Sequence, residues 1–285
     1  MKNRKNYIII YLLLNLLFAE DLIAPDLHSL ELIEYLNENY KTQTVLGYSN
    51  ARDILYSQID NNNGSVYGIY TNFSVELDPS EDPSVHLYEN GMNCEHLWPQ
   101  SLGAGTEPMK SDMHHLRPCK ENVNTSRGNK PFNDISDSQT NTWYWLNYQS
   151  GSIPQNNIDQ YSESGSYSFE PREDVKGDIA RSIFYFYTMY SNFADNDFFE
   201  EQKNLLKLWH YQDNVNEIEY QRTSNIASYQ DGFPNPFIID STLVRRCYFY
   251  VETIDGDINF DGNVNIIDVV LLVDFILGYQ SFNES

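Results

Sequence analysis

The spacing of apolar residues predicts a chain that mixes helices with short strands. Residues 27–36 and 51–59 carry apolar side chains at helical spacing, and 176–193 and 197–211 do so over longer runs. Residues 66–77 and 85–88 suggest short strands, while the polar stretch 133–170 predicts surface loop with one short strand near Trp143. These elements do not form repeated βαβ units, so the pattern predicts an α+β fold.

The N-terminus has the pattern of a secretory signal peptide. Lys2, Arg4 and Lys5 precede a twelve-residue apolar run over residues 7–18, which is too short to cross a bilayer. We assign residues 1–24 to this signal, with a buried N-terminal helix as the alternative. No apolar run has the length of a membrane span, so we exclude an integral membrane protein. We expect a secreted or cell-surface protein.

The C-terminal segment predicts a calcium site. Residues 257–268 place oxygen-bearing side chains at loop positions 1, 3, 5, 9 and 12, with Gly262 where a sharp turn is needed and Asp268 in place of the usual Glu at position 12. This EF-hand-like spacing suits Ca²⁺, whereas an Asx-rich turn without an ion is the alternative. The expected ligands are Asp257, Asn259, Asp261, Asn263, Asn265 and Asp268.

The helix that follows this loop is apolar on all sides. Such a helix must be buried against the body, a partner protein or a second repeat. Loop and helix together resemble one dockerin type I repeat, although dockerins normally have two. The resemblance implies a small docking domain at residues 255–279 with a cohesin-like or other surface partner, next to a catalytic domain at 25–250.

Composition and charge limit the function of the body. The chain is 41% hydrophobic and 14% aromatic, which is enough for a core, and its formal net charge is -23. Such a charge excludes a protein that coats nucleic acid by general attraction, because phosphate affinity comes mainly from lysine and arginine. Residues 91–132 differ, since they contain five basic and four acidic residues. A local site for a phosphate substrate is therefore compatible with the charge.

The polar residues that indicate chemistry lie in this same segment. Glu95 and His96 stand on a predicted strand, a second strand is expected over 112–116, and a helix with Asn124 begins after it. An imidazole is a suitable general base for activating water, and carboxylate and amide oxygens are suitable ligands for Mg²⁺. Guanidinium groups bind phosphate well, so Arg117 and Arg127 are the candidate phosphate clamps.

These three blocks resemble the endonuclease I family of secreted, non-specific nucleases with a ββα-metal (His-Me finger) core. The resemblance spans residues 27–247 and is sharpest over 93–132, where Glu-His, Asp-x-His-His-Leu and Val-Asn-x-x-Arg-Gly-Asn follow in order. It implies a monomeric endonuclease that uses Mg²⁺ (or Mn²⁺) at Glu95 and Asn124. It also implies that water activated by His96 cuts DNA to 5′-phosphate products, with RNA left open as a further substrate.

Three further expectations concern the surroundings of the site. His114 is expected to support His96. Neighbouring side chains on a strand point to opposite faces, so Glu95 and His96 require a bend or bulge at Glu95, or a Glu95 side chain that reaches around the strand edge, to act together. Among the three cysteines, Cys94 and Cys119 flank the site and are the first candidates for a disulfide.

Two other functions are compatible with the sequence. One is a calcium-dependent adhesion or scaffold protein whose core is inactive and whose tail carries the function. The other is a metal-dependent hydrolase that acts on a different phosphoester.

Overall fold

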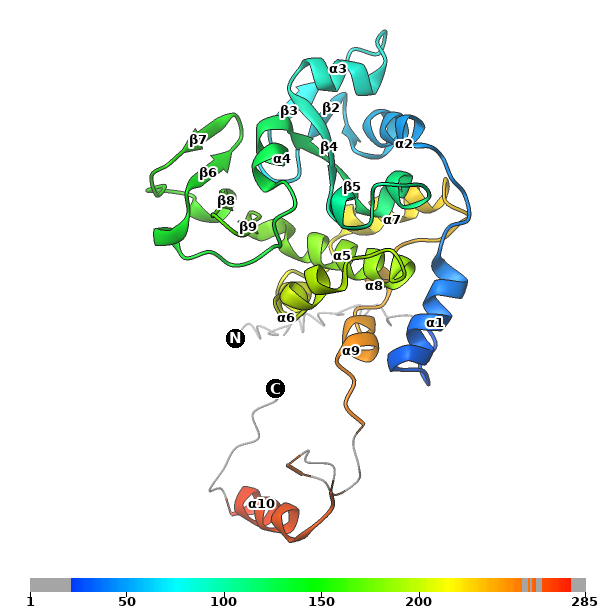
Figure 1. Ribbon diagram of the computed structural model, residues 1–285, viewed down its shortest axis with the longest axis vertical. Helices are drawn as coiled ribbons and strands as arrows, with labels where there is room; N and C mark the ends of the chain where they lie inside the picture. The colour runs from blue at the N-terminus through cyan, green and yellow to red at the C-terminus, as the bar shows by residue number, and fades with distance from the viewer. Residues whose placement is uncertain (1–21, 253–255, 257, 260–262, 278–285) are drawn as a thin grey trace, which may run out of the picture.

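Helix α5 (Lys176–Tyr190) runs through the middle of the protein and forms the centre of its larger core (Figure 1). The computed structural model describes residues 22–252, 256, 258–259 and 263–277. All residues of α5 except Asp178 and Tyr187 are buried. A helix buried on nearly every side belongs inside a core. The predicted long helix over 176–193 is thereby confirmed, although it ends at Tyr190.

Several helices surround α5. Helices α1 (Ser29–Tyr40), α6 (Asn196–Gln212) and α8 (Pro236–Ile239) pack on it, and α9 (Leu243–Tyr248) packs on α1. Aromatic side chains fill the space between them, as where Trp98 stacks on Phe186 with ring centroids 4.8 Å apart. The high aromatic content of the sequence therefore serves this core.

A second, smaller core lies on the other side of the central hairpin. It includes α2 (Tyr48–Ile54), the π-helical turn η1 (Leu55–Ile59), α3 (Pro83–Glu89) and α7 (Glu217–Ala227). An antiparallel sheet, β1 (Asn61–Asn62), β2 (Ser65–Tyr67) and β3 (Ser74–Glu76), completes it. The predicted strand at 85–88 is wrong. Asp82 caps a helix there by accepting a hydrogen bond from the Val85 N–H, and Pro83 occupies its first turn.

The central hairpin and the helix after it form the predicted strand–strand–helix unit. β4 (Met92–His96) pairs with β5 (Leu116–Lys120), and α4 (Glu121–Arg127) follows directly. The register is regular from Met92 to His96, so the bulge expected at Glu95 is absent.

The long connection within the hairpin contains three 3₁₀ turns: η2 (Gln100–Leu102), η3 (Met109–Ser111) and η4 (Met113–His115). The predicted strand over 112–116 is wrong for most of its length. The Asp112 carboxylate accepts a hydrogen bond from the His114 N–H, which starts the turn η4 instead. The strand begins only at Leu116.

The expected disulfide is absent, because all three cysteines are free and buried. Across the hairpin, Cys94 pairs with Pro118, whereas Cys119 pairs with Asn93. Paired residues share a face of an antiparallel hairpin and neighbours alternate, so the two thiols point to opposite faces. Cys94 packs in the smaller core and Cys119 in the larger one.

Residues 133–170 contain more regular structure than predicted. Strands β6 (Thr142–Trp145), β7 (Tyr148–Ser150), β8 (Ser162–Ser164) and β9 (Phe169–Glu170) form an antiparallel sheet in the order β7-β6-β8-β9. The short strand expected near Trp143 is confirmed as β6. Three further 3₁₀ turns occur in or after this region: η5 (Asp137–Gln139), η6 (Ile158–Gln160) and η7 (Glu173–Val175).

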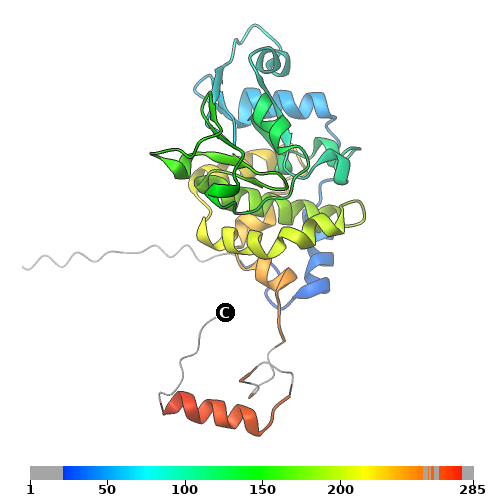
Figure 2. The same cartoon turned by 60° about the vertical axis from the view of Figure 1, so that its left-hand side comes forward.

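Helix α10 (Ile266–Ile276) lies apart from the other helices in two views of the molecule (Figures 1 and 2). Its N-terminus is capped, because Asn265 accepts a hydrogen bond from the Ile267 N–H while Asp268 accepts one from the Asn265 N–H. The Asp268 carboxylate also accepts the N–H groups of Ile258 and Asn259. Most apolar side chains of α10 are exposed, so burial against the body, one of the expected arrangements, is not observed.

Asp257 and Asp261, two of the expected calcium ligands, lie outside the described residues, as do residues 1–21 of the expected signal peptide. The calcium site, the dockerin-like role of residues 255–279 and the signal peptide therefore stay predictions. Among the helices that the structure describes, none combines the length and the apolar character needed to cross a bilayer.

One buried carboxylate joins the hairpin connection to the larger core. Asp112 is 2% exposed, and its Oδ2 accepts hydrogen bonds from the Tyr185 and Tyr190 hydroxyls at 2.9 and 2.8 Å. Its Oδ1 accepts the His114 N–H at 3.0 Å and the Gln230 amide at 2.9 Å. Burial raises the pKa of Asp112, but the nearby histidines and these hydrogen bonds outweigh it and lower the pKa. The carboxylate is therefore ionised and fully hydrogen-bonded.

Replacing Asp112 with asparagine is expected to lower the free energy of unfolding by ~3 kcal/mol. The side-chain NH₂ group of asparagine would face O–H or N–H donors that now donate to a carboxylate oxygen. Urea denaturation followed by circular dichroism measures the change. The exposed Asp26→Asn is the matched control and should change stability by less than ~0.5 kcal/mol. Equal stabilities of the two variants would contradict a structural role for the Asp112 carboxylate.

Candidate active site

A cleft of about 600 Å³ opens where β4 ends beside α2 and α4. It contains the three residues for which the sequence predicted chemistry, namely Glu95, His96 and Asn124. Glu95 and His96 both line this cleft although they are neighbours on a strand with regular pairing. Its other lining residues are Tyr48, Arg52, Tyr88, Asn93, Cys94, Pro99, Gln100, Ser101, Gly128 and Asn129.

Glu95 is held in a fixed position by two donors. Its Oε1 accepts a hydrogen bond from the Tyr70 hydroxyl at 2.7 Å and lies 3.2 Å from Nη1 of Arg127. The residue is 2% exposed, and burial raises the pKa of this carboxyl while Arg127 and Tyr70 act in the opposite direction. Both contacts engage Oε1, which leaves Oε2 as the oxygen available to a ligand in the cleft.

His96 has one ring nitrogen fixed by the backbone and the other on a polar side chain. Nε2 lies 3.1 Å from the Lys110 carbonyl oxygen, and only a protonated nitrogen donates to a carbonyl. The proton is therefore on Nε2, and Nδ1, which lies 3.3 Å from the Gln100 amide, carries the lone pair. Burial, followed by the neighbouring His115, lowers the pKa of His96 to about 3. The ring is consequently neutral near pH 7, with its Nδ1 unprotonated.

The Asn124 side chain is oriented by its amide protons. Nδ2 donates to the Asn93 Oδ1 at 2.7 Å and to the Cys94 carbonyl at 3.1 Å, which ties α4 to β4. With both protons used on the strand, the amide oxygen remains for another partner. One carboxylate oxygen and one amide oxygen lining the same cleft fit a hard divalent cation, which takes few protein ligands and keeps several waters.

The structure does not bring the two predicted arginine clamps to the cleft surface. Arg127 is fully buried, and its guanidinium donates to the carbonyls of His96 and Leu97 as well as contacting Glu95. Arg127 therefore positions the metal-ligand candidate and the end of β4. Arg117 is also buried, and its nearest charged partner is Asp178 at 3.6 Å, in a different cleft beside α7.

The histidine that supports His96 is also different from the predicted one. His114 packs on Tyr185 and places its Nε2 2.9 Å from the Phe233 carbonyl, away from the cleft. His115 lies closer, with its ring centroid 5.4 Å from that of His96. The misassignment follows from the predicted strand, because alternation on a strand does not apply to the 3₁₀ turn η4 that carries both residues.

Sequence reasoning missed the basic groups around Tyr48, of which Arg52 lines the cleft. The Arg52 guanidinium lies 4.5 Å from the centroid of the Tyr48 ring, and the Lys110 ammonium lies 5.2 Å from it. Nε of Arg52 is buried without a hydrogen-bond partner. The available signal was weak, namely a Tyr-x-x-x-Arg spacing that places both side chains on one face of α2. Arg52 is far from the motifs in sequence, and only the fold brings it beside His96.

Comparison with known proteins supports the resemblance found in the sequence. Residues 29–242 match the family model described as Endonuclease I. The chain is 29% identical over 220 residues to "Extracellular ribonuclease" of Bacillus subtilis (strain 168), which covers 68% of this chain and 66% of the relative.

It is also 30% identical over 167 residues to "Extracellular ribonuclease" of Bacillus amyloliquefaciens, covering 51% of this chain and 50% of that protein. The aligned parts thus span about two thirds and one half of the lengths of these two relatives. The family match covers most of the chain, including β4, β5 and α4. The chain therefore belongs to the endonuclease I family.

Proposed function

We propose that this protein is a secreted, metal-dependent nuclease that hydrolyses phosphodiester bonds in nucleic acid. The observation that carries the proposal is that His96, Glu95 and Asn124 line one cleft, with Nδ1 of His96 unprotonated and one oxygen each of Glu95 and Asn124 unengaged. The names of the two Bacillus relatives support an extracellular location and RNA as a substrate. The sequence motifs support DNA, so both polymers are proposed substrates.

His96 acts as the general base in this proposal. Its Nδ1 takes a proton from water, and the Lys110 carbonyl fixes the ring and its tautomer through Nε2. The partial negative charge of the same carbonyl oxygen stabilises the positive charge that develops on the ring. General-base assistance of this kind contributes roughly 10²- to 10⁴-fold in rate. The Gln100 amide, which lies on Nδ1, has to give way to the attacking water.

Glu95 and Asn124 would hold Mg²⁺ or Mn²⁺, which when bound neutralises charge on the phosphate and on the departing oxygen. Arg127 and Tyr70 fix the Glu95 side chain, and the Asn93 side chain fixes that of Asn124. The ligand oxygens are therefore oriented before any ion arrives, which limits the ordering that binding requires.

Arg52 and Lys110 supply the positive charge that substrate phosphate needs in this proposal. Both approach the Tyr48 ring, whose contact with His96 (centroids 5.1 Å apart) places them beside the general base. Arg52 also lines the cleft, where a guanidinium group suits a phosphate oxygen.

His96→Ala and Asn124→Ala should each lower the rate of plasmid nicking and of RNA cleavage by roughly 10²-fold or more, because one removes the base and the other a metal ligand. The assay offers supercoiled plasmid and a structured RNA side by side in Mg²⁺, with EDTA as the metal-free comparison. His28→Ala is the control and should cleave at the unchanged rate, because His28 precedes α1 and does not line the cleft.

Two outcomes would contradict the proposal. Cleavage by the wild-type protein no faster than that by His96→Ala would favour an inactive core serving the tail. Hydrolysis of small phosphoesters, with neither plasmid nor RNA cleaved, would favour a metal-dependent hydrolase that acts on a different phosphoester.

Arg52→Ala should lower kcat/KM roughly 10- to 100-fold, since a hydrogen bond from a charged group to phosphate is lost. It should also make cleavage less sensitive to salt, because one fewer cation meets the substrate. Arg52→Lys is expected to recover only part of the activity, as an ammonium lacks the bidentate geometry. The exposed Arg245→Ala on α9 is the charge-matched control, and a loss equal to that of Arg52→Ala would show that net charge alone matters.

A further inference from the structure

A second cleft, of about 830 Å³, lies on the β6–β7 hairpin and has no role in the site just described. We call it the hairpin groove. Three aromatic side chains line it, Trp145, Tyr148 and Tyr161, and the rings of Trp145 and Tyr161 are 5.4 Å apart. Tyr148 is 56% exposed, and the apolar Leu146 and Ile153 beside it are 43% and 45% exposed. A group of exposed apolar side chains around one hollow is typical of a binding surface.

The hairpin groove is electrically neutral on a strongly acidic protein. Residues 138–158, which include most of its lining, contain no Asp, Glu, Lys or Arg, whereas the whole chain has a formal charge of -23. The polar lining consists of side-chain amides and hydroxyls, including those of Asn147, Gln155 and Asn157. A polyanion approaching this protein is therefore repelled less here than over the acidic surface.

The hairpin groove is fixed to the helix that carries Asn124. Asn122, on the same helix α4, donates a hydrogen bond to the Gln149 side chain of β7 at 2.8 Å. Lys120, the last residue of β5, donates to the Asn147 side chain at 2.5 Å. Figures 1 and 2 both show the hairpin beside α4. The hairpin that carries the groove is therefore anchored to the end of β5 and to α4.

We propose that the hairpin groove stacks the bases of a single-stranded segment of the substrate. This inference rests on the proposed nuclease function and adds a preference for unpaired nucleic acid. Every base has a π-face, so aromatic side chains bind single strands with little sequence preference. Amide groups on the rim donate to and accept from base edges. In a duplex the bases are stacked inside the helix and do not reach the groove.

The test measures binding separately from cleavage. Two labelled ligands are compared: a single-stranded dodecamer that contains thymidine and uridine, and a duplex of the same length. The full-length His96→Ala variant is titrated into each of them in Mg²⁺. Introducing Tyr148→Ala into the His96→Ala variant should weaken binding of the single strand by roughly 5- to 150-fold, the range expected for the loss of one stacked base. Binding of the duplex should stay unchanged, and Tyr148→Trp should restore the lost affinity.

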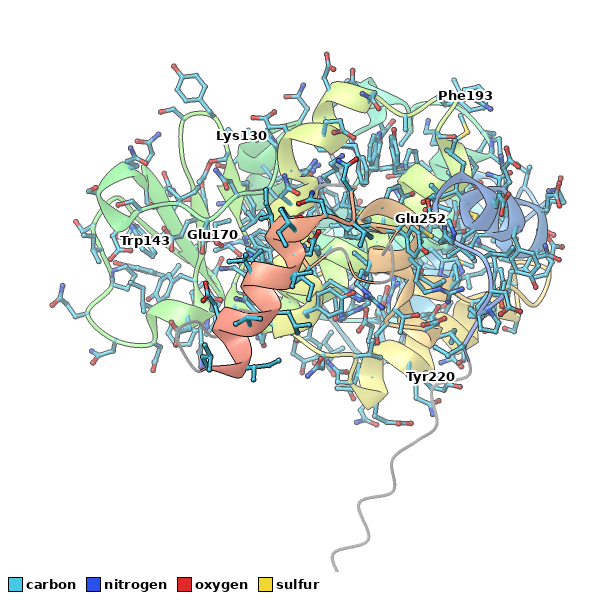
Figure 3. The ribbon with its side chains drawn as sticks, turned by 90° about the horizontal axis from the view of Figure 1, so that it is seen from below. Lys130, Trp143, Glu170, Phe193, Tyr220 and Glu252 are labelled. Atoms are coloured by element: carbon cyan, nitrogen blue, oxygen red, sulfur yellow. The ribbon has the colours of Figure 1, made fainter. Side chains whose placement is uncertain are left out.

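Tyr220→Ala is the matched control, because Tyr220 is 46% exposed on α7 and lies away from the β6 strand marked by Trp143 in Figure 3. Unchanged affinity of Tyr148→Ala for the single strand would overturn the inference, whatever else the groove binds. An equal loss for single strand and duplex would overturn it too. Cleavage of the oligonucleotide by the His96→Ala background would instead show that the proposed catalytic role of His96 is wrong.

Discussion

The four hydrogen bonds to the buried Asp112 carboxylate are the constraint on which the site depends. Two tyrosine hydroxyls of α5, one backbone N–H of η4 and the Gln230 side chain meet on this group. They hold the connection between β4 and β5 against the larger core. The Lys110 carbonyl lies two residues before Asp112 and fixes the His96 ring. The orientation of His96, the proposed general base, thus depends on a buried carboxylate that does not line the cleft.

A second buried charge organises the other side of the cleft. Arg127 is fully buried, contacts the Glu95 carboxylate and donates to two carbonyls at the end of β4. A buried carboxylate without such a partner would favour its neutral form, which is a poor ligand for a cation. Arg127 opposes that effect and also closes the turn that ends the strand. The same arginine therefore connects the folding of the hairpin to the chemistry of Glu95.

The sequence was most informative where local rules and buried chemistry agree. The strand–strand–helix unit, the long buried helix and the trio Glu95, His96 and Asn124 could be predicted, because each depends on residues close in sequence. The roles of Arg117 and Arg127 could not, since both lie in the right motif and only tertiary packing buries them.

Other errors have local causes. The helix at 83–89 follows from Asp82 and Pro83, a capping signal that outweighs the short apolar alternation after it. The sheet formed by β6–β9 is hidden in sequence because its strands are short and rich in polar residues. Arg52 reaches the cleft from an element more than forty residues before Glu95, a distance that no local pattern bridges.

The net charge of the chain explains why its contacts with nucleic acid have to be short-range. At physiological salt the electrostatic field of the net charge of -23 is screened beyond about 8 Å, but within that distance it repels a polyanion. In the proposed function, attraction then comes from groups that act at contact: a cation held by Glu95 and Asn124, the cationic side chains over Tyr48, and the aromatic rings of the hairpin groove. Stacking has no dependence on the net charge of the protein, so it is well suited to hold a strand where general electrostatics cannot. A substrate with unpaired bases is then favoured as a consequence of the acidic surface, because a duplex offers that surface only its phosphates.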